Sequence, residues 1–208
     1  MASNKKDGFL IIDGLNVSNW ESENVYRDLN KGNVNAINAT TATWENYSQT
    51  LDNIAVWYSK FNNRTDISLI RKVDDIFKAS DNGQVGIIIG FQNASPIENN
   101  LDYLYTFNEL NVKIIQFTYH ERNLLGNGCY ERVDEGITNF GIDAIKIMNE
   151  VGILIDLSHV GIVTTMETID YSEKPIAITH ANPKSYHNVP RNKTDEALKL
   201  MASKGGIV

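Results

Sequence analysis

The stretch VGILIDLSHVGIVTTMETIDYSEKPIAITHANPKSYHNVPRNKTD, residues 151–195, decides the predicted fold. Two apolar runs, residues 152–157 and 175–179, are typical of buried parallel strands, and about one helix of sequence separates them. A strand, a crossover helix and a second strand place both strand ends at the same edge of a parallel sheet. We therefore expect an α/β fold whose chemistry lies at that edge.

Each of these two strands ends on a short polar residue that is followed by a histidine. The first pair is Ser158-His159 and the second is Thr179-His180. Two imidazoles at one edge of a barrel are typical ligands for zinc and similar divalent ions. The alternative is that each histidine only makes hydrogen bonds within its own loop. Because the pattern is repeated, it favours metal binding, and His159 and His180 are the predicted metal ligands.

Apolar runs and amphipathic segments alternate along the rest of the chain. Further strands are expected at residues 8–13, 33–38, 67–70, 85–90 and 112–117, and helices at 47–61, 74–79, 95–110, 137–148 and 195–204. The helix start at Ser95 follows from Ser-Pro-Ile-Glu, which combines an N-cap serine, a proline at the first helical position and a glutamate three residues after the cap. Seven or eight strands alternating with helices predict one domain, residues 1–208, with a (β/α)8 TIM-barrel-like fold. Because a complete barrel usually needs about 250 residues, we expect it to be incomplete at the C-terminal end.

Composition and charge argue against several classes of function. The 208 residues are 42% hydrophobic, enough to bury a core, and the net charge of -7 disfavours a nucleic-acid partner. No apolar run is long enough to span a bilayer and no signal peptide is recognisable, so we expect a cytoplasmic protein without a membrane partner. The single cysteine, Cys129, cannot form an internal disulfide and is expected to be structural. The sequence leaves open whether the chain forms a homo-oligomer.

Three spaced motifs carry a resemblance to a known family. They are IDLSH at residues 155–159, ITHANP at residues 178–183 and P-R-N-x-T-D at residues 190–195. In this order they resemble the renal (membrane) dipeptidases, peptidase family M19, and in particular a divergent bacterial subgroup. Weaker matches at Asp13-Gly14 and at residues 90–92, 117–119 and 128–132 extend the resemblance over most of the chain. The resemblance implies a metal-dependent hydrolase of the amidohydrolase-barrel type.

In that family two zinc ions are bridged by a glutamate, and the bridging hydroxide attacks the carbonyl of a dipeptide. The resemblance places two histidine ligands of the second metal site on His159 and His180. It places the arginine that binds the substrate carboxylate on Arg191, a role that suits a rigid, bidentate guanidinium. Arg191 and Asn16 are the predicted substrate-binding residues.

The sequence departs from the family pattern at several ligand positions. Leu15 and Val17 stand where the family has the metal ligands of an H-x-D motif, and neither side chain can bind a metal. Gln92 replaces the bridging glutamate, and Tyr119 replaces a histidine that acts in the transition state. His120 follows directly, although strand alternation would turn it to the opposite face unless the loop bends. Gln92, Tyr119 and His120 are the predicted catalytic residues.

Two functions therefore remain open. The first is a hydrolase of dipeptides or small amides with a free carboxylate, which uses one zinc ion at most, held by His159 and His180. The second is a non-hydrolytic barrel that binds an amino acid or dipeptide through Arg191, Tyr119 and Gln92 after loss of the binuclear site. For Asp156, the carboxylate either orients a histidine or points away from the site.

Overall fold

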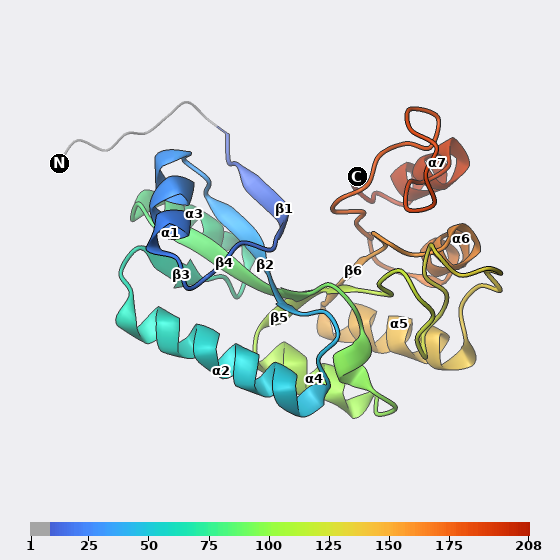
Figure 1. Cartoon of the computed structure of the whole chain (residues 1–208), viewed down its shortest axis with the longest axis horizontal. Coiled ribbons are helices and arrows are strands. Elements are labelled where there is room, and N and C mark those ends of the chain that lie inside the picture. The colour runs from blue at the N-terminus through green and yellow to red at the C-terminus, as the bar shows by residue number, and fades with distance from the viewer. Residues whose placement is uncertain (1–8) are drawn as a thin grey trace.

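A parallel sheet curled into an open half-barrel forms the centre of the computed structural model, which describes residues 9–208 (Figure 1). The strands are β1 (Ile12–Asn16), β2 (Ala36–Ala42), β3 (Ile67–Leu69), β4 (Val85–Phe91), β5 (Val112–Gln116) and β6 (Leu154–Asp156). Their order is β1-β2-β4-β5-β6, and β3 pairs with the first half of β4. Beyond β6, Ala177 makes parallel bridges to Asp156 and to Ile207, so the curl continues along the chain.

Helices flank the sheet on both faces. They are α1 (Glu23–Lys31), α2 (Tyr47–Asn63), α3 (Val73–Asp81), α4 (Asp102–Glu109), α5 (Asn139–Val151), α6 (Ile162–Tyr171) and α7 (Asp195–Ser203), with a short 3-10 turn, η1 (Ser95–Ile97). Figure 1 shows α2, α4 and α5 side by side beneath the strands. The start of α2 is fixed by a capping box, in which the Asn46 and Gln49 side chains each bind the other residue's backbone N–H. In the described residues, no helix is both long and apolar enough to cross a bilayer.

Alternation along the strands divides the apolar residues into two cores. One set, which includes Ile87 and Ile89 of β4, packs against the outer helices. The other set faces the inside of the half-barrel, where Ile88 and Ile114 pack with Ile76 of α3. The inner face is therefore apolar at the amino ends of the strands. Toward their carboxyl ends it becomes polar, and that half carries the site.

The strand–helix–strand prediction for residues 151–195 agrees with the structure in its order but not in every boundary. The predicted strand at 152–157 is β6, which is shorter, and the crossover helix is α6. The predicted strand at 175–179 is reduced to bridges at Ala177, although this segment is extended and runs beside β6, with Leu157 N donating to Ala177 O.

The predicted helix start at Ser95 is wrong. Only the turn η1 forms there, and α4 begins at Asp102. The Ser95 hydroxyl does not cap a helix, because it donates to the Thr43 and Glu45 carbonyls of the β2–α2 loop. Glu98 has a positive φ of 52°, which breaks the helical path, and its carboxylate accepts from Tyr47 N at 3.0 Å. Tertiary contacts thus override the local capping signal.

The first part of the chain contains three further differences. The strands predicted at 8–13 and 33–38 both lie later in the sequence, as β1 and β2, and Gly8 falls outside the described residues. The helix α1 was not predicted, because only Val25, Tyr26 and Leu29 supply apolar side chains in a run of polar residues. In the structure Tyr26 is buried in the outer core, which holds this helix in place.

Candidate active site

The polar half of the inner face begins with two buried carboxamides. Asn38 of β2 donates from Nδ2 to Gly14 O at 3.0 Å, and its Oδ1 lies over Gly90, where a Cβ atom would be only 2.1 Å away. Gln116 of β5 donates from Nε2 to the Gln92 and Thr118 carbonyls at 2.6 and 2.7 Å. Neither amide oxygen has a hydrogen-bond partner within residues 9–208. Buried acceptors without donors are unfavourable in a packed core and are typical of ligand sites.

His159 follows β6 and lies at the centre of the site. Its side chain is 4% exposed, and its backbone has a positive φ of 61°, a conformation that is uncommon for residues other than glycine. Its carbonyl accepts from Cys129 N at 2.8 Å, which fixes the turn to the loop after β5. Nδ1 of its ring is buried without a hydrogen-bond partner in the described chain.

The second histidine is fixed by the carboxylate of Asp156. Asp156 is buried and accepts from the Ser158 and Thr179 hydroxyls at 2.7 and 2.6 Å. Thr179 Oγ1 lies 2.7 Å from Nδ1 of His180, and the carboxylate itself is 3.8 Å from that nitrogen. The network leaves Nε2 of His180 buried and without a partner among residues 9–208. Of the two alternatives for Asp156, the structure thus has the carboxylate pointing into the site and holding the ring.

His120 reaches the same site because the loop after β5 bends. Its φ is +62°, so the strand alternation ends there and its ring turns toward His159, with the ring centroids 4.5 Å apart. Tyr119 also faces His159 and stacks on it at 4.6 Å with an interplanar angle of 27°. His159 and His180 have centroids 4.8 Å apart. Three imidazoles and one phenol therefore gather at one edge of the sheet.

Arg191 brings the positive charge of the site. One terminal nitrogen of its guanidinium donates to the His180 carbonyl, and the side chain is partly buried. Burial lowers the pKa of His120, His159 and His180, and the nearby Arg191 charge lowers each of them further. The pKa of His159 falls to about 3. For His180 the Asp156 carboxylate opposes this shift but does not reverse it. The imidazoles are therefore neutral near pH 7, the form in which they bind metals or accept protons.

The remaining predicted site residues lie at the side formed by β1 and β4. Gln92 follows β4 and is 7% exposed. Asn16 is the last residue of β1, and its side chain is engaged locally, since it donates to Asp13 Oδ2 at 2.9 Å and accepts from Ser18 N. Leu15 and Val17 flank it and offer no ligand atom. The structure thus brings Tyr119, His120, His159, His180 and Arg191 together, while the Asn16 side chain bonds to its neighbours in sequence.

The donor set fits one metal ion better than two. Among residues 9–208, His159 Nδ1 and His180 Nε2 are buried nitrogens without hydrogen-bond partners, which is the expected state of ligand atoms. Zinc usually takes four ligands, however, and within residues 9–208 no group of three or more His, Cys, Asp or Glu side chains is arranged to hold a metal. Water or substrate would have to complete the coordination of an ion bound there.

Lys193 was missed by the sequence analysis. It is the variable residue of the P-R-N-x-T-D motif, is completely buried and donates to Val160 O and, at 3.0 Å, to Thr165 Oγ1. Burial lowers the pKa of Lys193 to about 7. The signal that could have found it is its place inside the motif, between Asn192 and Thr194, but nothing in the sequence says that this position is buried.

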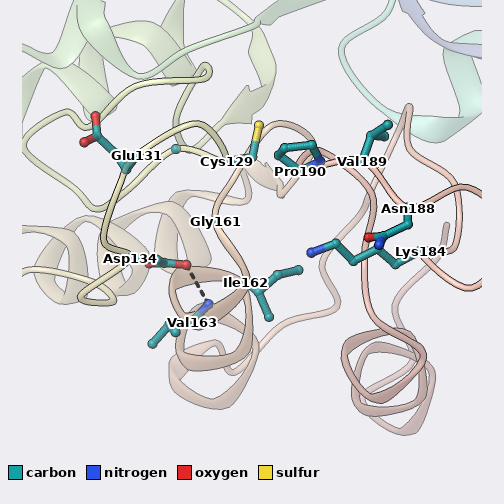
Figure 2. Close-up of a pocket in the computed structure, with 11 residues that line it drawn as sticks. Cys129, Glu131, Asp134, Gly161, Ile162, Val163, Lys184, Asn188, Val189 and Pro190 are labelled. Atoms are coloured by element: carbon teal, nitrogen blue, oxygen red, sulfur yellow. Dashed lines mark hydrogen bonds between the residues drawn. The ribbon is translucent and has the colours of Figure 1, made fainter.

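A cavity of about 310 Å³ lies directly behind the site. Its lining includes Cys129 and Gly161, which flank the His159 loop, and Pro190, which precedes Arg191. Figure 2 shows the Lys184 amino group pointing into it, while the Asp134 carboxylate binds Val163 N at the start of α6 at 2.7 Å. Burial raises the pKa of the Cys129 thiol, so it is protonated at neutral pH, in agreement with the structural role expected from the sequence.

Comparison with known proteins identifies related sequences. The family model described as membrane dipeptidase (peptidase family M19) matches residues 14–208. A dipeptidase from Clonostachys rogersoniana is 24% identical over 169 residues, which are 80% of this chain and 44% of that protein. An uncharacterized dipeptidase from Schizosaccharomyces pombe is 27% identical over 154 residues, 72% of this chain and 36% of that protein. The chain thus spans less than half the length of these two relatives.

Solved structures with the same fold include two informative examples. An amidohydrolase from Pseudomonas aeruginosa is 40% identical, with a TM-score of 0.92 over 95% of this chain and 61% of that one. A metallopeptidase from Rhodobacter sphaeroides, solved with a phosphinate mimic of the dipeptide L-Ala-D-Ala, is 16% identical, with a TM-score of 0.82 over 97% of this chain and 73% of that one. At that identity the likeness shows the fold alone. Together these findings confirm the predicted α/β, TIM-barrel-like fold class.

Proposed function

The chain belongs to the membrane dipeptidase family, peptidase family M19, and we propose that it hydrolyses dipeptides or small amides that carry a free carboxylate. The observation that carries the proposal is the set of side chains at the carboxyl ends of β5 and β6. There the rings of His120 and His180 both lie within 5 Å of His159, and Arg191 stands beside them. The guanidinium of Arg191 can bind an anionic group of a substrate, and the neutral imidazoles beside it can accept and donate the proton that hydrolysis of an amide bond requires.

Arg191 would bind the carboxylate of the substrate. One of its five N–H donors is used by the His180 carbonyl, which fixes the guanidinium and leaves other donors for a ligand. A planar guanidinium binds a carboxylate through two parallel hydrogen bonds and so sets the orientation of the substrate. This contact places the amide at a set distance from the imidazoles.

His120 would move the proton. Because its pKa is lowered by burial and by Arg191, it is neutral near pH 7 and can accept a proton from the attacking water. The same nitrogen can then donate that proton to the amine that leaves when the C–N bond breaks. The Tyr119 hydroxyl is suited to donate a hydrogen bond to the carbonyl oxygen as negative charge develops on it. Gln92, which follows the adjacent strand β4, is a second candidate donor.

The metal of the family would be held by His159 and His180. The sites predicted from sequence and the buried, unpartnered ring nitrogens support one ion, which we propose to be zinc. When bound, such an ion supplies Lewis acidity to the substrate carbonyl and to the attacking water. The role of Asp156 is to hold the His180 ring through Thr179, which keeps Nε2 directed into the site.

A non-hydrolytic binding protein is the second candidate. It is favoured by one specific observation, namely that Leu15, Val17 and Gln92 offer no carboxylate or imidazole where the family has metal ligands. Such a protein would keep Arg191 and the Tyr119 ring for an amino acid or a dipeptide and would carry out no reaction.

The experiment that separates the two is a measurement of hydrolysis and of binding on the same sample. Wild-type protein with added zinc is incubated with a panel of dipeptides and with amides that lack a free carboxylate, and release of amino acids is followed. We expect hydrolysis of the dipeptides and little of the blocked amides. Binding of a dipeptide by calorimetry without any hydrolysis at enzyme concentrations near the substrate concentration would contradict the hydrolase and support the binding protein.

A further inference from the structure

We propose that Lys193 is a positioning residue, which sets the distance between the Arg191 guanidinium and the His159 ring by tying the loop of one to the loop of the other. The inference rests on the proposed function, because it gives Lys193, the x of P-R-N-x-T-D, a role in the same site. The motif itself specifies no residue type at this position.

The side chain of Lys193 makes the link. Its ammonium group donates to Val160 O, the carbonyl next to His159, and to Thr165 Oγ1 in the first turns of α6. The residue is completely buried, and no carboxylate of residues 9–208 forms an ion pair with it. Its hydrogen bonds are thus directed at the backbone and the helix that carry His159, not at a neighbouring acid.

The backbone around Lys193 carries the effect to Arg191. Lys193 N donates to Asn182 O at 3.1 Å, and Lys184 N donates to Lys193 O at 2.7 Å. Between them, the Asn192 side chain donates to His187 O at 2.7 Å and accepts from Asn182 N at 3.1 Å. Residues 182–193 are therefore closed on themselves as one unit, and a shift of Lys193 would move Arg191 with it.

The longer segment 180–193, which contains this unit, is attached to the His159 loop at two ends. At one end, His180 N donates to Ser158 Oγ at 3.0 Å. At the other end, the attachment is the contact of Lys193 with Val160 and Thr165. A loop held at one end only can rotate about that end, whereas a loop held at both ends cannot. The hydrogen bond from Arg191 to the His180 carbonyl fixes the guanidinium within this segment, and the Lys193 attachment fixes the segment relative to the His159 loop.

A role in fold stability alone does not account for a lysine at this position. A buried ammonium without a counter-ion is unfavourable, and an apolar side chain of similar length would fill the same volume without that cost. Charged and titratable groups that face Lys193 are Cys129 from the loop after β5, Asp134 and Asp156 as acids, and Lys184 from its own loop. The two acids lie near enough to act on the pKa of Lys193 but do not touch it.

Three variants of the whole chain test the proposal. Lys193→Met keeps the length and removes the donor, Thr165→Val removes one acceptor of the same contact, and Lys184→Met removes a lysine of the same loop whose side chain makes no ion pair in residues 9–208. Each is assayed for kcat and KM with L-alanyl-L-alanine, and its histidine ring signals are recorded by ¹⁵N NMR in metal-free protein.

We expect Lys193→Met to raise KM about tenfold with kcat changed less than about threefold, and to shift the ring signals of His159 and His180 while that of His187 stays in place. Thr165→Val should change KM and the ring signals of His159 and His180 in the same direction but to a smaller extent. Lys184→Met should match wild type in both measurements. If Lys193→Met matches Lys184→Met in KM and in the ring signals, the positioning role is refuted, whatever its thermal stability. Should Lys193→Met fail to fold, an unchanged Thr165→Val would overturn the proposal. If wild-type protein hydrolyses nothing, the proposed function fails, and the ring signals still decide the role of Lys193.

Discussion

The two sides of the barrel mouth differ in what they can bind. On the side of β1 and β4, Leu15, Val17 and Gln92 offer no carboxylate or imidazole, and the Asn16 side chain is bonded to Asp13 and Ser18, its near neighbours in sequence. On the side of β5 and β6, three imidazoles and Arg191 gather, and a buried carboxylate orients one of the rings. The same sheet supports both sides, so the difference lies in the residues that follow its strands, both in their side chains and, at His120 and His159, in their backbone conformation.

This contrast teaches which part of the family's chemistry the chain retains. Under the proposed function, the residues that would bind a carboxylate and one metal ion lie on one side, and the other side lacks the carboxylate and imidazole groups that a second ion would need. The fold of both sides is that of the family, which agrees with a TM-score of 0.92 to an amidohydrolase from Pseudomonas aeruginosa. Fold alone therefore does not predict how many ions are bound.

The largest expected effect is the loss of metal binding when either imidazole ligand is removed. His159→Ala and His180→Ala should each weaken zinc binding by about a thousandfold, because an ion held by two imidazoles keeps only one of them. Isothermal titration with zinc measures this. His187→Ala is the control, since His187 is exposed in the loop before Pro190. Unchanged affinity in both ligand variants would refute the assigned site.

Removal of the Arg191 guanidinium should have the next largest effect. Arg191→Ala is expected to raise KM for a dipeptide about a hundredfold. KM for a substrate with a blocked C-terminus should change little, because that substrate has no carboxylate for Arg191 to bind. Steady-state kinetics with the two substrates measures the ratio. An equal effect on both would mean that Arg191 supports the His180 loop without binding the carboxylate.

The free energy of unfolding should depend on pH through the protonation of Lys193. Its pKa is about 7 in the folded chain and about 10.4 when unfolded, so the unfolded state binds the proton more tightly between these values. Stability should therefore rise with pH from about 7 toward 10, by about 2 kcal/mol between pH 7 and pH 9, and Lys193→Met should lose this rise. Urea denaturation of both proteins at the two pH values measures it. An identical pH dependence in the two proteins would contradict a buried, weakly protonated lysine.

The smallest expected change is a gain on the ligand-poor side. The triple variant Leu15→His, Val17→Asp, Gln92→Glu restores the side-chain types of the missing ligands and should raise the zinc content from one ion per chain to two. Elemental analysis after dialysis against zinc counts the ions. A variant that still binds one ion while keeping its fold by circular dichroism would show that the backbone of β1 also differs from that of a binuclear site.

Much of the ligand-rich side could be predicted from the sequence because it depends on local order. Two parallel strands that are joined by a helix, and that are each followed by a histidine, suffice to bring His159 and His180 together. The order of strands and helices is equally local: the apolar periodicity of α2 and the continuous apolar run of β4 identified these two elements.

Other features depend on contacts that no local pattern encodes. His120 joins the site only because its backbone is left-handed, which reverses the alternation expected for a strand end. Ser95 has the signals of a helix N-cap, yet its hydroxyl is used by the β2–α2 loop. Lys193 is buried by the closure of residues 182–193, and a lysine in a polar loop is ordinarily exposed. In each case a long-range contact decides the role of the residue.

The central claim is that metal binding belongs to one side of the mouth only, and metal content per chain tests it most directly. Protein purified without chelators and without a histidine tag is dialysed against zinc, then against metal-free buffer, and analysed for metal and for protein concentration. We expect about one zinc ion per chain. A content of two ions, or of none, would refute metal binding at one side only.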